Sequence, residues 1–165
     1  MIEISPCMLK LIETVEGRRH KTYQCGAGHW TIGVGHKLTR DELEMGAIKI
    51  DGRLVQWRGG LTDEQIDILA RQDTETACWA IVSGVRVPLT ECQRAALASF
   101  VFNVGINAFR DSTLLKKLNE GDYGAVPHEL MRWVHATTAD GQKVRQKGLE
   151  SRRAQEVAMW RGEVA

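Results

Sequence analysis

The chain has 165 residues, of which 43% are hydrophobic and 26% are charged, and its formal net charge at pH 7 is +1. This length is enough for one domain with a sizeable core, and the near-zero charge gives no reason to expect a nucleic-acid partner. No apolar run approaches the length of a membrane span, and charged residues interrupt residues 1–17. We therefore expect no stable membrane insertion and no signal peptide, and a protein made and kept in a cytoplasm.

The N-terminal part of the chain predicts one helix followed by a hairpin. Apolar residues at helical spacing predict a helix over 5–16 that ends at Gly17, which leaves Glu16 in its last turn. Over 20–34 the pattern changes to a partial alternation of apolar and polar residues, and the glycines of residues 26–28 supply a turn. These features predict a small antiparallel hairpin.

A short helix, a second turn signal and a series of longer helices follow. A capping box at 39–42 starts a short helix that ends near Gly46. The dipeptide Asp51-Gly52 is typical of hairpin turns, and with its apolar flanks it indicates either a second sheet element or an ordered loop over 49–60. Further along the chain the pattern is helical throughout. The helices predicted there cover 62–83, 90–104, 113–118, 127–134 and 148–160.

This order of elements predicts an α+β fold with the strands near the N-terminus. We expect a single domain with a small β-rich lobe over about 17–60 and a larger helical lobe over about 61–165 plus the N-terminal helix. An active-site cleft is expected between the two lobes.

The chain contains four cysteines and no C-x-x-C pair. Without a secretion signal, free thiols are expected. Cys7, Cys78 and Cys92 lie in segments with helical patterns, where cysteine commonly acts as a small buried hydrophobic residue. Cys25 lies in the predicted hairpin and is considered separately below.

Positive charge is concentrated near the C-terminus, because residues 141–153 contain five cations and one acid. Such a segment is either a solvated, flexible basic stretch or a patch that faces a polyanion such as a bacterial wall or membrane. The five cations are Lys143, Arg145, Lys147, Arg152 and Arg153.

Three side chains in and before the first hairpin have the chemistry needed to hydrolyse a glycosidic bond. Such reactions commonly use one protonated acid and a second group that activates water or attacks the sugar. Glu16 would protonate the leaving oxygen, a thiolate at Cys25 would take a proton from water or attack the anomeric carbon, and Thr31 would hold the water. Each residue also has an ordinary structural interpretation, as a solvated acid, a buried thiol or a strand threonine.

Residues 16–39 resemble the catalytic segment of the bacteriophage-type lysozymes, family 24 of the glycoside hydrolases. The family signature is E-x8-(D or C)-x5-T followed by I-G-x-G-H, and the sequence EGRRHKTYQCGAGHWTIGVGHKLT matches this spacing throughout. Further family motifs follow in order almost to the C-terminus. They include Phe102-Asn103-Val104-Gly105, Arg132-Trp133 and Gly148-Leu149-x-x-Arg152-Arg153-x-x-Glu156.

The resemblance implies a lysozyme-like fold and an endolysin. Such a muramidase hydrolyses the β-1,4 bond between N-acetylmuramic acid and N-acetylglucosamine in peptidoglycan, which lyses the host cell. It needs no cofactor and no metal. The resemblance also implies a monomer that stays in the bacterial host cytoplasm until a holin partner releases it to the wall.

The resemblance further implies residue roles. Glu16 takes the general-acid position, Cys25 takes a position that is Asp in many members and Cys in some, and Thr31 matches the threonine near the nucleophilic water. Asn103 and Arg132 match positions that line the sugar cleft.

For His36 the family pattern implies a structural ion pair with Asp73. This role is favoured over a role as general base.

A cysteine at the second catalytic position changes the expected chemistry. A free thiol has a pKa of about 8.5, against about 3.9 for aspartate, so little thiolate forms at neutral pH unless cations stabilise it. Arg18, Arg19, His20 and Lys21 are close to Cys25 in sequence. We expect Cys25 to position or deprotonate water, with inversion at the anomeric carbon, and a covalent route through sulfur is the minor alternative.

Four other functions remain as alternatives. Cys25 with His20, His29 and His36 could surround zinc, although their spacing matches no recognised ligand motif. The chain could be a catalytically weakened peptidoglycan-binding module, or the basic helix over 148–160 could disrupt anionic membranes. Lytic transglycosylation would cleave the same bond without water.

Overall fold

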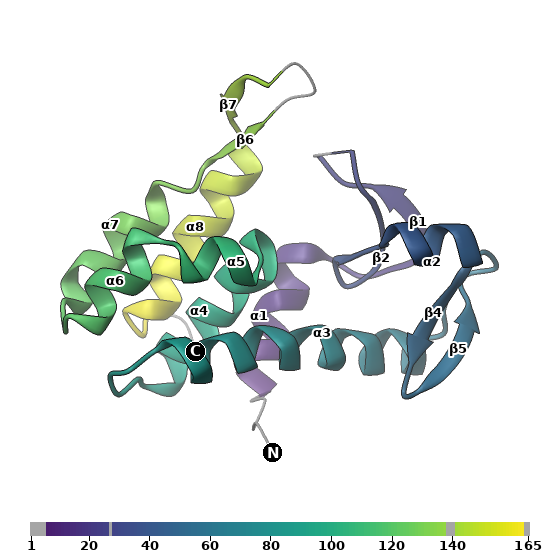
Figure 1. The fold of residues 1–165 in the computed structure, drawn as a ribbon, viewed down its shortest axis with the longest axis horizontal. Coiled ribbons are helices and arrows are strands. Elements are labelled where there is room, and N and C mark those ends of the chain that lie inside the picture. The colour runs from purple at the N-terminus through teal and green to yellow at the C-terminus, as the bar shows by residue number, and fades with distance from the viewer. Residues whose placement is uncertain (1–5, 27, 138–140, 164–165) are drawn as a thin grey trace. The chain divides into compact units, whose positions relative to one another are not determined.

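The computed structural model describes residues 6–26, 28–137 and 141–163. It divides into two compact units, one formed by Ile12–Asp73 and the other by Met1–Leu11 with Thr74–Ala165. Figure 1 shows helices together with small antiparallel sheets, so the predicted α+β class is confirmed.

The unit Ile12–Asp73 contains the predicted first hairpin, extended by a short third strand. The sheet is antiparallel with the order β1-β2-β3, and Tyr23 pairs with Thr31 across the first two strands. The third strand has only two residues, too few for an alternating pattern to reveal it. The elements are the end of α1 (Pro6–Glu16), β1 (Arg19–Gln24), β2 (Trp30–Gly33) and β3 (His36–Lys37).

Local sequence signals fix the next part of this unit. Thr39 and Glu42 form the predicted capping box of α2 (Arg40–Met45), which ends at Gly46 with φ of 69°. Asp51 and Gly52 have φ of 47° and 74°, as a two-residue hairpin turn with left-handed central residues requires. This turn joins β4 (Ala47–Ile50) to β5 (Arg53–Gln56), so of the two expected forms the sheet element is the one that occurs.

The core of this unit is aliphatic. Its buried side chains come from the end of α1, from β2 and β4, and from the start of α3 (Asp63–Gly84). Burying such side chains contributes about 1.5–3 kcal/mol each, before the entropy cost of ordering them. The buried residues include Ile12, Ile32, Val34, Ile48, Ile50, Ile66 and Leu69.

His36 forms the predicted ion pair with Asp73, and it has a second carboxylate partner. Its Nδ1 lies 2.8 Å from Oδ2 of Asp73 and its Nε2 lies 3.2 Å from Oε2 of Glu42. Burial lowers the pKa of the imidazole, but the hydrogen bonds and charges of Asp73 and Glu42 outweigh burial and raise it above its ordinary value. His36 is therefore a structural residue.

The second unit is helical, with one small hairpin. The helix α4 (Glu91–Val104) packs against α8 (Lys147–Trp160), and both were predicted. The helix α5 and the β6–β7 hairpin were not predicted, and α7 ends at Met131 rather than Val134. The other elements are α5 (Ile106–Arg110), α6 (Thr113–Asn119), the 3-10 turn η1 (Tyr123–Ala125), α7 (Val126–Met131), β6 (His135–Thr137) and β7 (Lys143–Arg145).

A charged cluster is buried between α4 and α8. Arg153 and Glu156 are both fully buried, and Arg152 is 5% exposed. Glu156 accepts a hydrogen bond of 2.8 Å from Ser99 Oγ, and its carboxylate lies 3.2 Å from Nε of each arginine. The guanidinium of Arg153 also lies 4.9 Å from the ring centroid of Phe100.

This cluster corrects the prediction of a solvated basic segment over 141–153. Two of its five cations are buried because α8 turns Arg152 and Arg153 toward Glu156 and α4. The same contacts weigh against α8 as a membrane-disrupting helix, since Trp160 is buried as well. No helix among the described residues has the length and apolarity needed to cross a membrane.

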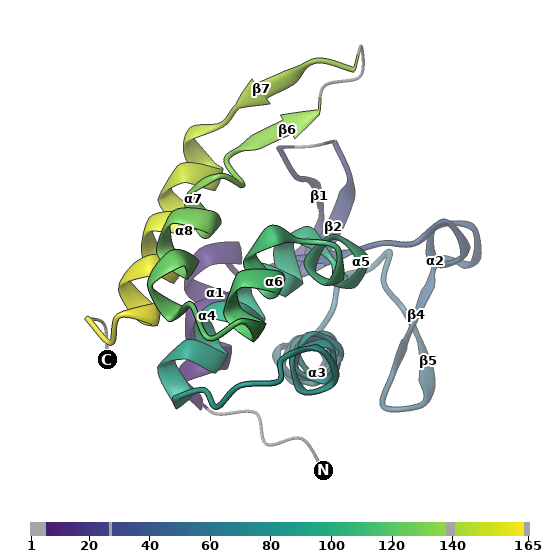
Figure 2. The same cartoon turned by 60° about the vertical axis from the view of Figure 1, so that its left-hand side comes forward.

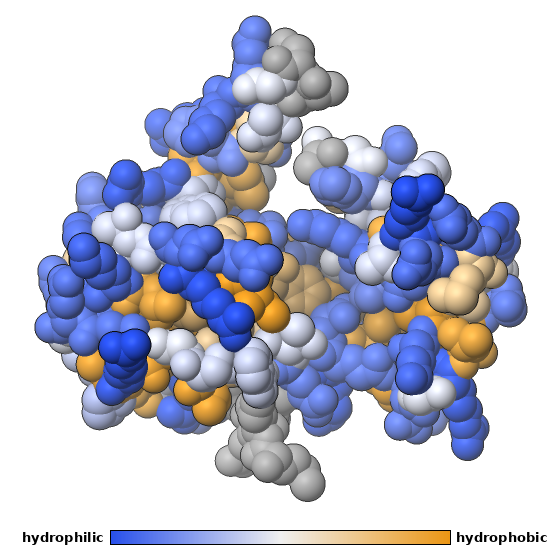
Figure 3. All heavy atoms as spheres, in the orientation of Figure 1, coloured by the Kyte–Doolittle hydropathy of each residue, from blue (hydrophilic) through white to orange (hydrophobic). Residues whose placement is uncertain are grey.

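Two further cations of the basic segment, Lys143 and Arg145, lie on β7, which pairs with β6 in the register of His135 opposite Arg145. The hairpin extends away from α7 and α8 (Figures 1 and 2). Hydrophilic residues cover most of the hairpin surface seen in Figure 3. This part of the segment is therefore solvated as predicted, but it has regular structure.

The prediction for the cysteines is confirmed in part. Cys78 is buried, where burial raises the pKa of its thiol to about 11. Cys92 is only half-buried, because it lies in the exposed first turn of α4. The prediction for the Cys7 side chain lies outside the described residues.

We expect Asp73→Asn to destabilise the protein by roughly 1–3 kcal/mol at about pH 6, because it removes a hydrogen bond to a charged, mostly buried histidine. A histidine whose folded pKa is raised stabilises the fold fully below its unfolded pKa of about 6.5, and this contribution is lost as the pH rises through the folded pKa. The loss should therefore shrink at about pH 9. Urea unfolding at both pH values measures it.

The control for this test is Asp41→Asn, which removes an exposed carboxylate from the first turn of α2. Its effect should be small at both pH values. An equal destabilisation by Asp73→Asn at the two pH values would contradict a charged His36 in the folded protein.

Candidate functional site

Glu16 is the last residue of α1, and the chain turns sharply after it. Gly17 has φ of 73°, and its N–H donates to the carbonyl of Glu13 over 2.8 Å, which ends the helix. The Glu16 side chain is half-buried. The helix end therefore places a carboxyl group beside the turn that follows β2, where the backbone of Gly35 faces it.

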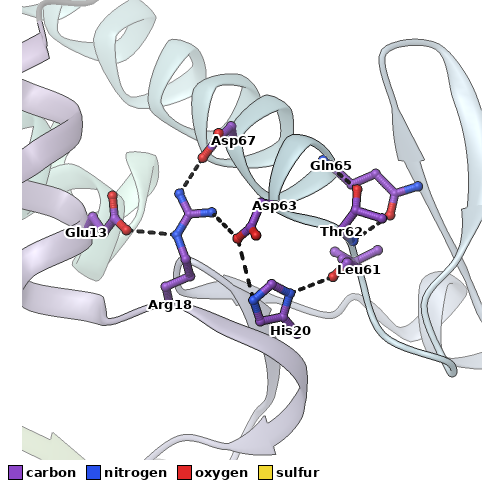
Figure 4. A network of polar contacts seen from close by, with 8 residues as sticks. All are labelled: Glu13, Arg18, His20, Leu61, Thr62, Asp63, Gln65 and Asp67. Carbon is purple, nitrogen blue, oxygen red and sulfur yellow. Dashed lines mark hydrogen bonds and ion pairs between the residues drawn. The ribbon is translucent and has the colours of Figure 1, made fainter.

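Arg18 holds the segment that follows Glu16 (Figure 4). Its Nε donates to Glu13 over 2.8 Å and its Nη1 to Asp63 over 3.1 Å, while its Nη2 forms a short contact with Asp67. The hydrogen bonds that Arg18 donates to Glu13 and Asp67 raise its pKa above the ordinary value. Arg18 therefore fastens the end of α1 to the first turns of α3.

Three of the four cations close to Cys25 in sequence have other partners. Besides the contacts of Arg18, His20 Nδ1 lies 2.8 Å from the carbonyl oxygen of Leu61. Arg19 lies over the ring of Tyr23, 5.4 Å from its centroid. These contacts weaken the expectation that this group of cations serves the thiol.

Cys25 and Thr31 are joined through one backbone carbonyl. The carbonyl of His29 accepts a hydrogen bond of 2.9 Å from the N–H of Cys25 and one of 3.0 Å from Oγ1 of Thr31. The N–H of Gly28 donates to the carbonyl of Cys25 over 2.7 Å, within the segment where the glycines predict a turn. Cys25 is a half-buried free thiol, and Thr31 is 2% exposed.

Tyr23 is affected by the charges of two candidate residues, Glu16 and Cys25. It pairs with Thr31 across the sheet. Burial raises the pKa of its phenol, the charges of Glu16 and Cys25 raise it further, and Arg19 opposes them. The charges of Glu16 and Cys25 therefore both act on Tyr23, whose partner across the sheet is Thr31.

Sequence reasoning missed Tyr23 and the carbonyl of His29. Tyr23 precedes Cys25 by two residues, and this spacing, typical of residues on one face of a strand, was the available signal. A backbone acceptor has no sequence signal, because any residue supplies one.

Asn103 and Arg132 lie in the other unit. Asn103 is half-buried on α4, and its Oδ1 accepts a hydrogen bond of 2.7 Å from Nη2 of the buried Arg153. This contact fixes which end of the Asn103 amide faces the charged cluster. Glu156, through Arg153, therefore helps to orient Asn103.

Arg132 lines a pocket of about 400 Å³. The buried Glu129 also lines this pocket. Its carboxylate accepts hydrogen bonds from Lys117 over 2.7 Å and from Arg132 over 2.9 Å. The hydrogen bond from Lys117 is the main reason why the pKa of Glu129 is lowered, despite burial. The pocket combines an aromatic ring with cations, and it is lined by Thr113, Glu129, Arg132, Trp133, His135, Thr137 and Lys143.

The residues of the alternative zinc site have other contacts. His36 binds two carboxylates, and His20 binds a backbone carbonyl. Within the described part of the chain, no three His, Cys, Asp or Glu side chains form a group suited to a metal ion. The side chains of Glu16, Cys25 and Thr31 can transfer protons or position a water molecule.

The sequence matches the phage lysozyme family over residues 13–156. It is 38% identical over 159 residues to an endolysin of Acyrthosiphon pisum secondary endosymbiont phage 1, covering 96% of this chain and 98% of that relative. The fold is similar to that of the endolysin from Escherichia coli O157:H7 phage FAHEc1, with a TM-score of 0.80, 31% identity and coverage of 98% and 95% of the two chains.

A second solved structure, the muramidase domain of SpmX from Asticaccaulis excentricus, is similar over 97% of this chain and 98% of that one, with a TM-score of 0.76 and 31% identity. These likenesses extend over nearly the whole chain and agree with its α+β architecture. The chain belongs to the phage lysozyme family and is a lysozyme of the endolysin type, a lytic enzyme that hydrolyses peptidoglycan.

Proposed function

We propose that this lysozyme cleaves the β-1,4 bond between N-acetylmuramic acid and N-acetylglucosamine with Glu16 as the general acid and with Cys25 and Thr31 at the attacking water. The observation that supports this most is the joint arrangement of the three residues. One carbonyl, that of His29, anchors both Cys25 and Thr31, and Tyr23 responds to the charges of both Glu16 and Cys25.

The proposed reaction is a single displacement. Glu16 gives its proton to the glycosidic oxygen as the bond to the anomeric carbon breaks. A water molecule held by Thr31 attacks the anomeric carbon from the opposite face, and Cys25 orients this water or accepts its proton. The new sugar end carries the water oxygen, with inverted configuration.

Substrate binding by the other unit is a further part of the proposal. Trp133 supplies an aromatic face to the pocket, and Arg132 and Lys143 supply cations, a combination suited to a polar, partly anionic wall fragment. The ring of Trp133 is held edge-on against Phe100, with centroids 5.4 Å apart. Asn103, oriented by Arg153, is proposed as a second polar contact to the substrate.

The cellular setting is proposed from the family resemblance. The enzyme would accumulate as a monomer in the host cytoplasm and reach the wall through a pore made by a holin. Expression with and without a holin, followed by cell fractionation and turbidity, tests this route.

We expect Glu16→Gln to lower kcat by about a thousandfold, because the amide cannot donate the proton that the leaving oxygen needs. The fold should remain intact, since the side-chain shape is kept. The measurement is release of reducing ends from purified peptidoglycan, together with a thermal melt. The control Glu64→Gln, at an exposed position of α3, should keep wild-type activity. Full activity of Glu16→Gln would exclude Glu16 as the acid.

We expect Cys25→Ser to lower kcat strongly, by about a hundredfold, and Cys25→Asp to keep most of the activity. Serine cannot accept the water proton near neutral pH, whereas aspartate can. The acid limb of the pH–rate profile should move to lower pH in Cys25→Asp, because aspartate ionises below a thiol. The control Cys92→Ser removes another half-buried thiol. Wild-type kcat in Cys25→Ser would show that the thiol does not act on the water.

A further inference from the structure

Gly35 lies unusually close to the Glu16 side chain. It is buried in the turn between β2 and β3 and has φ of 72°. A Cβ built on Gly35 would lie 2.7 Å from Cδ of Glu16 and 2.8 Å from both Cγ and Oε2. Real side chains do not approach so closely, so the space beside the carboxyl group exists only because residue 35 has no side chain.

We propose that Gly35 is a positioning residue of this lysozyme, whose bare backbone forms the wall against which the Glu16 carboxyl group is held. The proposal rests on the role of Glu16 given under the proposed function. It adds a second residue, on a different element, that determines where the acid stands.

The turn that carries Gly35 is anchored and does not readily move away. His36, the next residue, binds Asp73 and Glu42, and Val34 on the other side is 3% exposed. The backbone that follows Glu16 in the chain is fixed too. Gly17 ends α1, and Arg18 is bound to Asp63 of α3. An added methyl group would therefore displace the Glu16 side chain rather than the turn.

This displacement affects activity more than folding. The three atoms nearest the added Cβ all belong to the Glu16 side chain, from Cγ outward, and a side chain can change rotamer more readily than anchored backbone can move. A general acid moved by about an ångström, however, loses much of its effect on the reaction. The left-handed φ of residue 35 adds backbone strain when a side chain is present. The resulting loss of stability is shared by every glycine with a positive φ that is replaced by alanine.

Two other glycines of the same unit serve as matched controls. Gly52 has φ of 74° and nothing within 4 Å of its Cβ position. Gly33, at the start of the same turn as Gly35, has φ of 67° and ordinary contacts of 3.7 Å to Leu69 and 3.8 Å to Ile66. Alanine at either position reproduces the backbone strain without contact to Glu16.

The test compares kcat, KM and melting temperature of Gly35→Ala, Gly52→Ala and Gly33→Ala on soluble peptidoglycan fragments. We expect Gly35→Ala to lower kcat by about a hundredfold with KM unchanged. The two controls should lose similar stability and keep wild-type kcat. A kcat of Gly35→Ala equal to that of Gly52→Ala would overturn the proposal. If Gly35→Ala does not fold, Gly35→Asn carries the same test, since asparagine tolerates a left-handed φ.

A double-mutant cycle distinguishes positioning from general damage. Glu16→Asp shortens the acid by one methylene group and withdraws it from the position of the added Cβ. If Gly35 positions the acid, Glu16→Asp should lower kcat less in Gly35→Ala than in the wild type. Equal losses in the two backgrounds would contradict direct contact between the two residues.

The result separates this proposal from the proposed function. Activity in Glu16→Gln would remove the role of Glu16 itself. An inactive Glu16→Gln with a fully active Gly35→Ala would remove only the role of Gly35.

Discussion

The confinement of the Glu16 carboxyl group at the end of α1 is the constraint on which the unit Ile12–Asp73 and its proposed chemistry depend. Glu16 ends α1, Gly17 reverses the chain, and Arg18 fastens the following segment to three acids on α1 and α3. From there β1 leads to the turn of Cys25, and β2 returns to Thr31. The acid and the two groups proposed to act on water therefore come from one continuous stretch of chain, held at both ends.

A second buried interaction organises the helical unit. Two arginines of α8 meet Glu156 and Ser99 where α4 and α8 pack, and removing one partner of such a buried pair costs roughly 3–5 kcal/mol. The cluster also binds Asn103 through Arg153. Its Glu156 is the last residue of the match to the phage lysozyme family.

Much of the fold follows from local signals in the sequence. The capping boxes that begin at Thr39 and Thr90, and the Asp51-Gly52 turn, each occur as predicted, because they satisfy backbone groups with neighbouring residues. The spacing from Glu16 to Thr31 identified the candidate site, although it gave no distances. The predicted division into lobes over about 17–60 and 61–165 remains a prediction.

Features that depend on partners distant in sequence were not predictable. The burial of Arg152 and Arg153 requires Ser99 and Phe100 on another helix, so composition alone indicated a solvated segment. The strands β3, β6 and β7 are too short for an alternating pattern. The contact of Gly35 with Glu16 joins two residues whose types, a glycine and an acid, suggest no interaction.

The central claim is that water, activated beside Cys25 and Thr31, cleaves the sugar bond with Glu16 as the acid. Digestion of purified peptidoglycan in water labelled with oxygen-18, followed by mass spectrometry of the fragments, tests this claim most directly. Hydrolysis predicts reducing N-acetylmuramic acid ends that each carry one labelled oxygen. Unlabelled anhydro ends would show that the bond is cleaved without water and would contradict the account.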